Sequence, residues 1–262
     1  MASVGETIHA ALLTGVPRDK VMRVRRLARD WRLSRLTWHF DGAMPPRPAW
    51  PRDLQLLPPN RMPKRGRAGS HRSRVALWHS LAHIEFVAID LALDMTGRFG
   101  KQMGPAFVAD FLSVAADEAM HFALIQRKLA SLGAHYGALP VHDGLWEAAH
   151  ETRHDVAARL AIVPMVLEAR GLDVTPAMLE RVRLAGDESG ARILERILDD
   201  EIRHVAIGAK HFRETCLTHG EAPREMWRNL VEMHFRGALK PPFNDSARLA
   251  AGLSRDWYAS VA

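Results

Sequence analysis

The chain has 262 residues, of which 47% are hydrophobic and 25% are charged, proportions that are ordinary for a soluble globular protein. A chain of this length can bury a substantial core, as one large domain or as one domain with an appendage. The single cysteine, Cys216, excludes an intramolecular disulfide and a cysteine-rich zinc site.

The hydropathy and the N-terminus predict where the protein works. No apolar run approaches the roughly 18 residues that are needed to cross a bilayer. The first residues contain Glu6 and no basic segment, which is unlike a secretory signal. Because the lack of disulfides also suits a reducing compartment, we expect a cytoplasmic protein that has no membrane partner.

The charge is distributed unevenly along the chain, although the formal net charge is +6. Residues 1–74 contain 16 Lys and Arg against 5 Asp and Glu, whereas residues 75–262 contain 20 against 25. The sequence therefore divides into a basic arm and a mildly acidic body.

The arm contains one predicted helix and one irregular connector. In residues 17–38, Val24, Leu27, Ala28 and Trp31 recur at helical spacing among arginines, which predicts an amphipathic helix. Prolines recur in residues 43–69 with no apolar period, which predicts an extended connector. We expect the apolar stripe to dock on the body. Because arginines occupy the opposite face, an acidic or RNA partner stays open as the alternative.

The body is predicted to be all-α, because strand patterns are nearly absent and apolar residues recur at steps of three and four. Gly97, Gly100 and Gly104 are expected to break the chain after the first helix, and Gly133 is expected to cap the second. The predicted long helices cover residues 73–95, 105–131, 144–170 and 187–215, with shorter helices in 222–239.

The third long helix contains the least regular sequence. Pro164 is expected to kink it, and Gly171 is expected to end it. Asp173 and Pro176 then offer an N-cap and a first-turn proline for a new segment.

Two of the long helices contain the same short motif. Asp117-Glu118-Ala119-Met120-His121 lies in the second helix, and Asp200-Glu201-Ile202-Arg203-His204 lies in the fourth. Residues three apart share a helix face, so each Glu and His can converge on one point. The first and third helices each contain one central carboxylate, Glu85 and Glu168, and each lies 33 residues before the Glu of the following motif. Each residue of the second set also follows its counterpart in the first set by 83 residues. The candidate metal ligands are Glu85, Glu118, His121, Glu168, Glu201 and His204.

These carboxylates lie on apolar helix faces, where an uncompensated negative charge is costly. Two divalent cations would balance four glutamates, and each histidine would add one nitrogen ligand. Mixed carboxylate and imidazole ligation suits iron or manganese better than zinc. The sequence therefore predicts a site for two metal ions.

The order Glu, Glu-x-x-His, Glu, Glu-x-x-His over residues 73–215 resembles that of the ferritin-like di-iron carboxylate superfamily. More narrowly, the chain is similar to the bacterial ferritin-like family called domain of unknown function 455. The strings AHIEFVAIDLALD, HDGLWEAAHET, VLEARGLDVTP, DEIRHVAIG and PFNDSARLAAG carry this likeness. The resemblance implies a ferritin-like four-helix bundle with two iron ions, with manganese or a mixed manganese–iron pair as alternatives. It implies no particular substrate.

Three residues beside the ligands are candidates for a supporting role. Asp117 and Asp200 can accept a hydrogen bond from the second nitrogen of a ligand histidine, and Arg203 can join that network. The alternative for Asp117 and Asp200 is a solvated helix face or an ion pair with a nearby arginine, and the alternative for Arg203 is a surface ion pair. His83 is interpreted as a packing or surface histidine, because it lies two residues from Glu85 and points elsewhere on a helix.

The two tyrosines, Tyr136 and Tyr258, lie outside the four predicted long helices. A tyrosyl-radical generator needs a tyrosine beside its metal cluster, so their positions argue against that class.

The leading hypothesis is a non-haem di-iron oxidoreductase, an O2-activating oxygenase or oxidase with an unidentified small-molecule substrate and electron donor. The alternatives are a ferroxidase-like iron-binding protein without an organic substrate and an RNA-modifying hydroxylase, tRNA included. No catalytic residue beyond the metal ligands is assigned, no organic cofactor is expected, and a homodimer is left open. We expect three regions. Residues 1–70 form a basic helical and proline-rich extension that packs on the bundle, residues 71–220 form the di-metal four-helix bundle, and residues 221–262 form a C-terminal helical extension.

Overall fold

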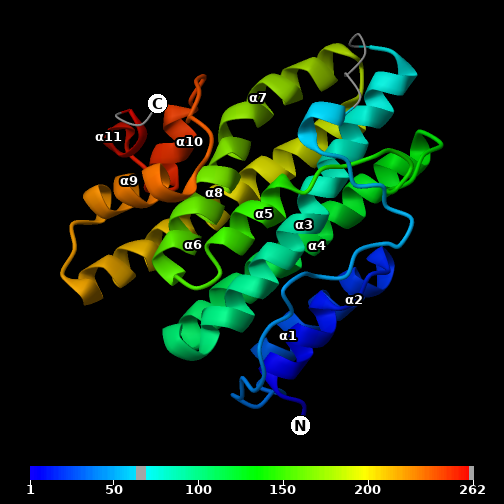
Figure 1. Cartoon of the computed structure of the whole chain (residues 1–262). Helices are drawn as coiled ribbons and strands as arrows, with labels where there is room; N and C mark the ends of the chain where they lie inside the picture. The colour runs from blue at the N-terminus through cyan, green and yellow to red at the C-terminus, as the bar shows by residue number, and fades with distance from the viewer. Residues whose placement is uncertain (63–68, 260–262) are drawn as a thin grey trace. The chain divides into compact units, whose positions relative to one another are not determined.

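The chain folds almost wholly into helices, as the computed structural model shows (Figure 1). The structure describes residues 1–62 and 69–259. Within these ranges it contains no strand, and only two isolated β-bridges occur. The all-α prediction is therefore confirmed.

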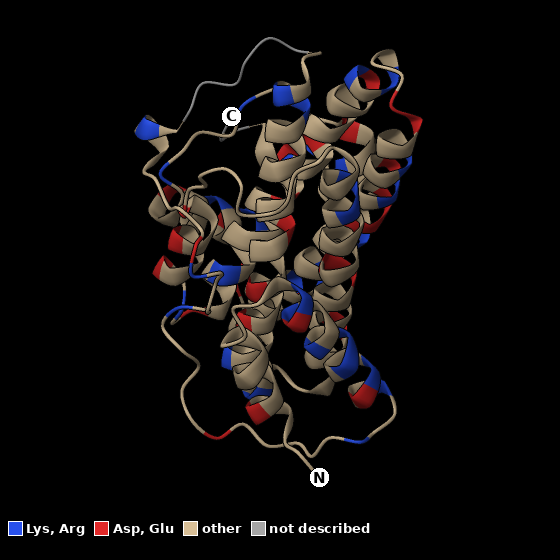
Figure 2. Cartoon of the chain, turned by 90° about the vertical axis from the view of Figure 1, so that its right-hand side faces the viewer, with Lys and Arg blue, Asp and Glu red and all other residues tan. Residues whose placement is uncertain are grey.

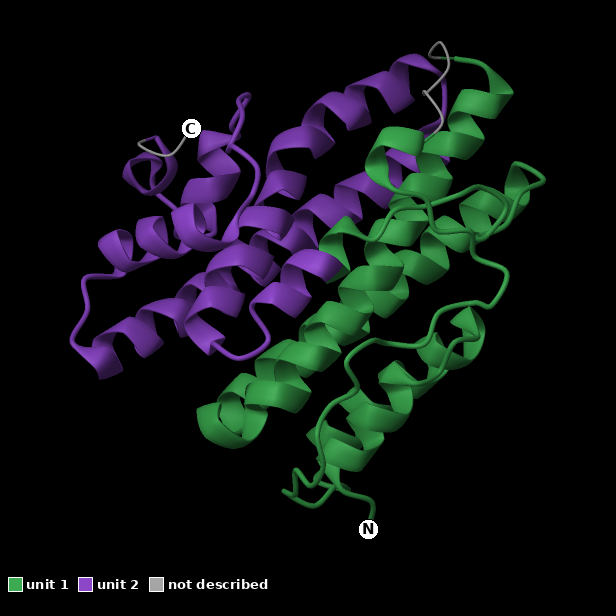
Figure 3. Ribbon diagram, viewed as in Figure 1, with its two compact units in different colours: residues 1–146 green, residues 147–262 purple. Residues whose placement is uncertain are grey.

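The helices group into two compact units, residues 1–146 and 147–262 (Figure 3). The helix α5 (Gly144–Glu151) contains the boundary between them. The first unit contains α1 (Val4–Leu12), α2 (Pro17–Arg32), the 3₁₀ turn η1 (Pro59–Arg61), α3 (His71–Met103) and α4 (Pro105–Ser131). The second contains α6 (Val156–Ile162), the π-helical segment η2 (Val163–Glu168), α7 (Ala169–Leu184), α8 (Glu188–His219), α9 (Pro223–His234), α10 (Asp245–Ala250) and α11 (Arg255–Tyr258).

In the first unit, the N-terminal residues cover the two long helices. The helix α1 packs against α3, and α2 packs against α4. The apolar stripe of α2 is buried, with Val24 and Leu27 at most 1% exposed. The helix α1 was not predicted. Its N-terminus is fixed by a capping box, in which Ser3 and Glu6 each accept a hydrogen bond from the other's backbone N–H.

A buried ion pair also joins α2 to α3. The Lys20 ammonium donates to the Asp90 carboxylate, and both side chains are 0% exposed. The indole N–H of Trp50 donates to the second Asp90 oxygen at 3.0 Å. Each charge is thereby compensated, which a buried ion requires.

The helix α3 is longer than predicted, because Gly97 and Gly100 do not break it. A Cβ at Gly97 would collide with Met44, and a Cβ at Gly100 would press on Phe40 and Val108. These glycines therefore allow close packing inside a continuous helix. The helix ends at Gly104, whose positive φ of 92° favours glycine.

The helix α3 contains no uninterrupted apolar run of about 18 residues, but its length and mean hydropathy are sufficient to cross a membrane, and it is the one such helix within residues 1–62 and 69–259. However, 67% of its most apolar window is buried inside the protein. This burial is typical of the core helix of a soluble protein.

The third predicted helix is divided and then extended. Its first part stops at Glu151, and Asp155 caps α6 by accepting from the N–H groups of Ala157 and Ala158. The kink expected at Pro164 takes the form of the π-helical segment η2.

The helix end predicted at Gly171 and the N-cap predicted at Asp173 are wrong, because α7 runs through both residues and through Pro176. The Asp173 carboxylate does not cap a helix. It accepts two hydrogen bonds from the buried Arg248, at 2.7 and 2.8 Å, and so ties α7 to α10 within the second unit.

Candidate metal centre

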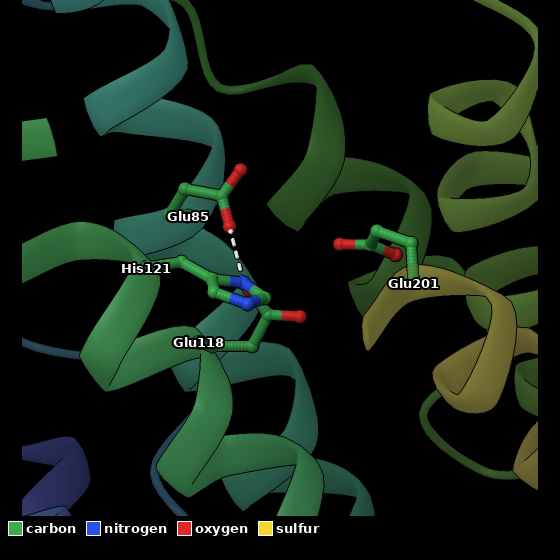
Figure 4. Close-up of side chains that lie close together, drawn as sticks. All are labelled: Glu85, Glu118, His121 and Glu201. Carbon is green, nitrogen blue, oxygen red and sulfur yellow. Dashed lines mark hydrogen bonds and ion pairs between the residues drawn. The ribbon is translucent and has the colours of Figure 1, made fainter. Parts of the chain in front are cut away.

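Three of the predicted ligands meet between α3 and α4, which pack against each other within the first unit. Glu85 lies near the middle of α3, and Glu118 and His121 lie one turn apart on α4. The His121 Nδ1 atom lies 3.2 Å from a Glu85 oxygen and 3.4 Å from a Glu118 oxygen. Figure 4 shows Glu85 and His121 pointing toward each other, with Glu118 beside them.

Burial dominates the electrostatics of this group. Glu118 and His121 are 0% exposed and Glu85 is 4% exposed. Desolvation and then the charge of Glu118 raise the pKa of Glu85 to about 8, although the hydrogen bond from His121 opposes the rise. Without a cation the group therefore keeps a proton at neutral pH.

A metal ion fits this set of residues. One donor atom of each side chain lies within 4.8 Å of the donor atoms of the other two. A cation would take the place of the retained proton and offset the negative charge of both carboxylates. The first unit thus contains a buried Glu/His cluster that can hold a metal ion.

The second unit places the matching residues less closely together. Glu201 and His204 lie one turn apart on α8, both buried, with the His204 Nδ1 atom 3.9 Å from a Glu201 oxygen. Glu168 is the last residue of η2 and is half-buried. Figure 4 also labels Glu201, which α8 contributes.

The residues predicted to support the ligands have different surroundings. Asp200 accepts a hydrogen bond from Arg196 at 2.6 Å, one turn earlier on α8, and Arg203 is exposed. Asp117 is half-buried. The Asp200 contact is the arginine pair that was the alternative interpretation of this residue, and the supporting role stays a prediction.

Sequence reasoning missed a buried polar cluster in the first unit, formed by His79, His83 and Tyr136. The Tyr136 hydroxyl donates to His83 Nδ1 at 2.8 Å, while His83 Nε2 donates to the His142 carbonyl at 3.0 Å. His79 Nε2 accepts from the N–H of Gly137 at 3.0 Å. Burial lowers the pKa of His79 and of His83 to about 4, so both are neutral and hold the connection after α4 in place.

The position of Tyr136 also corrects an argument from sequence. It lies outside the long helices, yet its ring packs 5.1 Å from Phe86 of α3 and 5.3 Å from Phe122 of α4. Position along the chain is therefore not a sufficient reason to separate this tyrosine from the ligand-bearing helices. No pattern of helical periodicity reveals a contact that a loop residue makes.

The fold and the cluster define an all-helical protein with a buried Glu/His group that can bind a metal ion. The chain belongs to the family described as protein of unknown function (DUF455), which matches residues 13–259. An uncharacterized protein of Haemophilus influenzae is 39% identical in an alignment of 222 residues that covers 81% of this chain and 77% of that protein. No solved structure matches the chain. Membership of this family is confirmed, and the wider ferritin-like relationship stays a prediction.

Proposed function

We propose that this protein is a non-haem di-iron oxidoreductase that uses O2 to oxidise a small organic substrate. The observation that carries the proposal is the buried convergence of Glu85, Glu118 and His121 within the first unit. A protein rarely buries two carboxylates and an imidazole side by side unless a cation or a function compensates them.

The second half of the proposed centre comes from the repeated motif. Glu168, Glu201 and His204 repeat the spacing of the first set at an offset of 83 residues. In our proposal, each set supplies two carboxylates and one imidazole to a shared pair of iron ions. The donor set supports iron or manganese because it combines hard oxygen ligands with imidazole and contains no thiolate.

Within this proposal, the metal pair supplies the redox equivalents for the reduction of O2. The residues of the chain bind the ions, set their open positions and keep the surroundings apolar. Phe86 and Phe122, which follow Glu85 and His121 in sequence, are fully buried and pack at 5.1 Å from each other. They exclude water from this part of the first unit, which protects a reactive centre from side reactions.

Anaerobic loading with ferrous iron, followed by a pulse of O2 under optical and Mössbauer observation, tests the proposal. We expect a paired ferric spectrum and rapid O2 consumption, both lost in Glu118→Ala. Glu180→Ala, which removes an exposed carboxylate of α7, should leave both unchanged. Mononuclear ferric signals alone would contradict the proposal. A ferric pair that no added reductant returns to the ferrous state would instead indicate a ferroxidase.

A further inference from the structure

The outer face of α2 presents a row of arginines that the packing of this helix does not use. Val21, Val24 and Leu27 face inward and are buried. Four exposed arginines at helical spacing share one flank of the outer face, and we call them the arginine row: Arg18, Arg25, Arg29 and Arg32. From the helical rise, the row spans about 21 Å.

Little negative charge lies along this row. Asp30 is the one carboxylate that approaches it among the described residues, at 3.6 Å from Arg29, and it also lies 3.4 Å from Arg26 and 3.6 Å from Arg35. No described carboxylate lies within 4.0 Å of Arg18, Arg25 or Arg32. Figure 2 shows Lys and Arg in blue and Asp and Glu in red. The row is therefore a concentrated positive surface with little internal compensation.

The type of cation on this surface also favours phosphate as a ligand. Every exposed cation of α2 is an arginine, because its single lysine, Lys20, is buried against Asp90. A guanidinium group binds a phosphate through two parallel hydrogen bonds, whereas an ammonium group acts as a point charge.

An exposed aromatic side chain follows the C-terminal end of the row. Trp38 is 42% exposed and packs 6.0 Å from Trp31 and 5.0 Å from Phe40. These contacts hold its ring while leaving part of it open to solvent. Such a ring is a platform on which an unpaired base can stack.

We propose that the arginine row and Trp38 form a binding surface for single-stranded nucleic acid. The row would neutralise successive phosphates, and Trp38 would stack one base. The combination favours nucleic acid over an acidic protein, because a carboxylate partner would use the guanidinium groups but not the exposed indole. This inference does not depend on the metal centre, so removal of metal should leave the binding unchanged.

Fluorescence anisotropy of the full chain with a labelled uridine RNA of about twelve nucleotides tests this surface. Four phosphate contacts predict that affinity falls roughly 50-fold between about 50 and 200 mM salt. In Arg25→Gln/Arg32→Gln, two contacts remain and the same change should be only about sevenfold. Trp38→Ala should weaken binding about fivefold or more at either salt concentration.

The matched control is Arg181→Gln/Arg192→Gln, which removes two exposed arginines of α7 and α8. The control should bind RNA like the unaltered chain, and circular dichroism should show all variants folded. A deoxyuridine strand of equal length identifies the kind of strand that is preferred: tighter binding of RNA indicates RNA, tighter binding of DNA indicates DNA, and equal binding indicates a surface that accepts either strand. Absence of binding at low salt, equal weakening in the control, or equally strong competition by polyglutamate would overturn the proposal.

Discussion

Removal of one partner of the buried Lys20–Asp90 pair should destabilise the first unit strongly. Both side chains are 0% exposed, so Asp90→Ala leaves an ammonium group buried without its counter-ion. Breaking a buried pair in this way typically costs about 3–5 kcal/mol. For a chain of this size, such a loss lowers the melting temperature by about 10 °C.

The double variant Lys20→Met/Asp90→Asn separates the charge effect from the packing effect. It removes both charges, nearly conserves volume and keeps an acceptor for the Trp50 indole N–H. We therefore expect its free energy of unfolding to lie within about 1 kcal/mol of the unaltered chain, because replacing both ions is often neutral. Urea unfolding followed by circular dichroism measures all three proteins. A double variant as unstable as Asp90→Ala would refute the reasoning, because the loss would then come from packing and not from an uncompensated charge.

Three further predictions concern stability. Burial raises the pKa of the Asp90 carboxyl group to about 6 in the folded protein, whereas its usual pKa of 3.8 applies in the unfolded chain. As the pH rises, the unfolded chain therefore loses this proton before the folded protein does. The free energy of unfolding should consequently fall by up to roughly 3 kcal/mol as pH rises from about 4 to 6, and Asp90→Asn should flatten this slope in a pH series of urea titrations. In thermal melts, Gly208→Ala should destabilise the second unit by more than about 1 kcal/mol, because the new methyl group collides with Pro164. Gly171→Ala should stabilise the unit slightly, because its methyl group meets no atom within 4 Å and alanine favours the helix. Arg248→Ala should cost up to about 3–5 kcal/mol in urea unfolding, because the buried Asp173 carboxylate then has only the part-exposed Arg170, at 3.4 Å, as a cation among the described residues. A loss below about 1 kcal/mol would show that Arg170 or solvent compensates this carboxylate.

The helix boundaries that depend on local signals were predictable from the sequence. Pro105 and Gly133 frame α4, whose bounds match the predicted range 105–131. The fourth long helix was predicted to begin at residue 187, and α8 begins at Glu188, with the Asp187 carboxylate capping it by accepting from the N–H of Gly190. The capping box of Ser3 and Glu6 was also readable, and reading it would have revealed α1.

Boundaries that depend on tertiary contacts were not predictable. Gly97 reads as a helix breaker, but Met44 fills the space that its missing side chain leaves. Asp173 reads as an N-cap, but Arg248, 75 residues away, binds its carboxylate. In both cases a partner distant in sequence overrides the local preference.

In the candidate site, too, the contacts set by helix periodicity were predictable and those set by tertiary folding were not. The period of α4 alone places Glu118 and His121 on one face, and the structure brings Glu85 of α3 to them. By contrast, the contacts of Tyr136 with His83, Phe86 and Phe122 depend on how the loop after α4 folds back. Periodicity predicts which side chains share a face, but not which loop residue will cover that face.

The number of iron ions bound per chain is the direct test of the proposed di-iron centre. The protein should be purified without oxygen, loaded with ferrous iron, freed of excess metal and analysed for iron and protein in the same sample. We expect about two iron ions per chain and a sharp loss of iron in Glu118→Ala and in Glu201→Ala. Two iron ions per chain in both variants, or no bound iron in the unaltered protein, would contradict it.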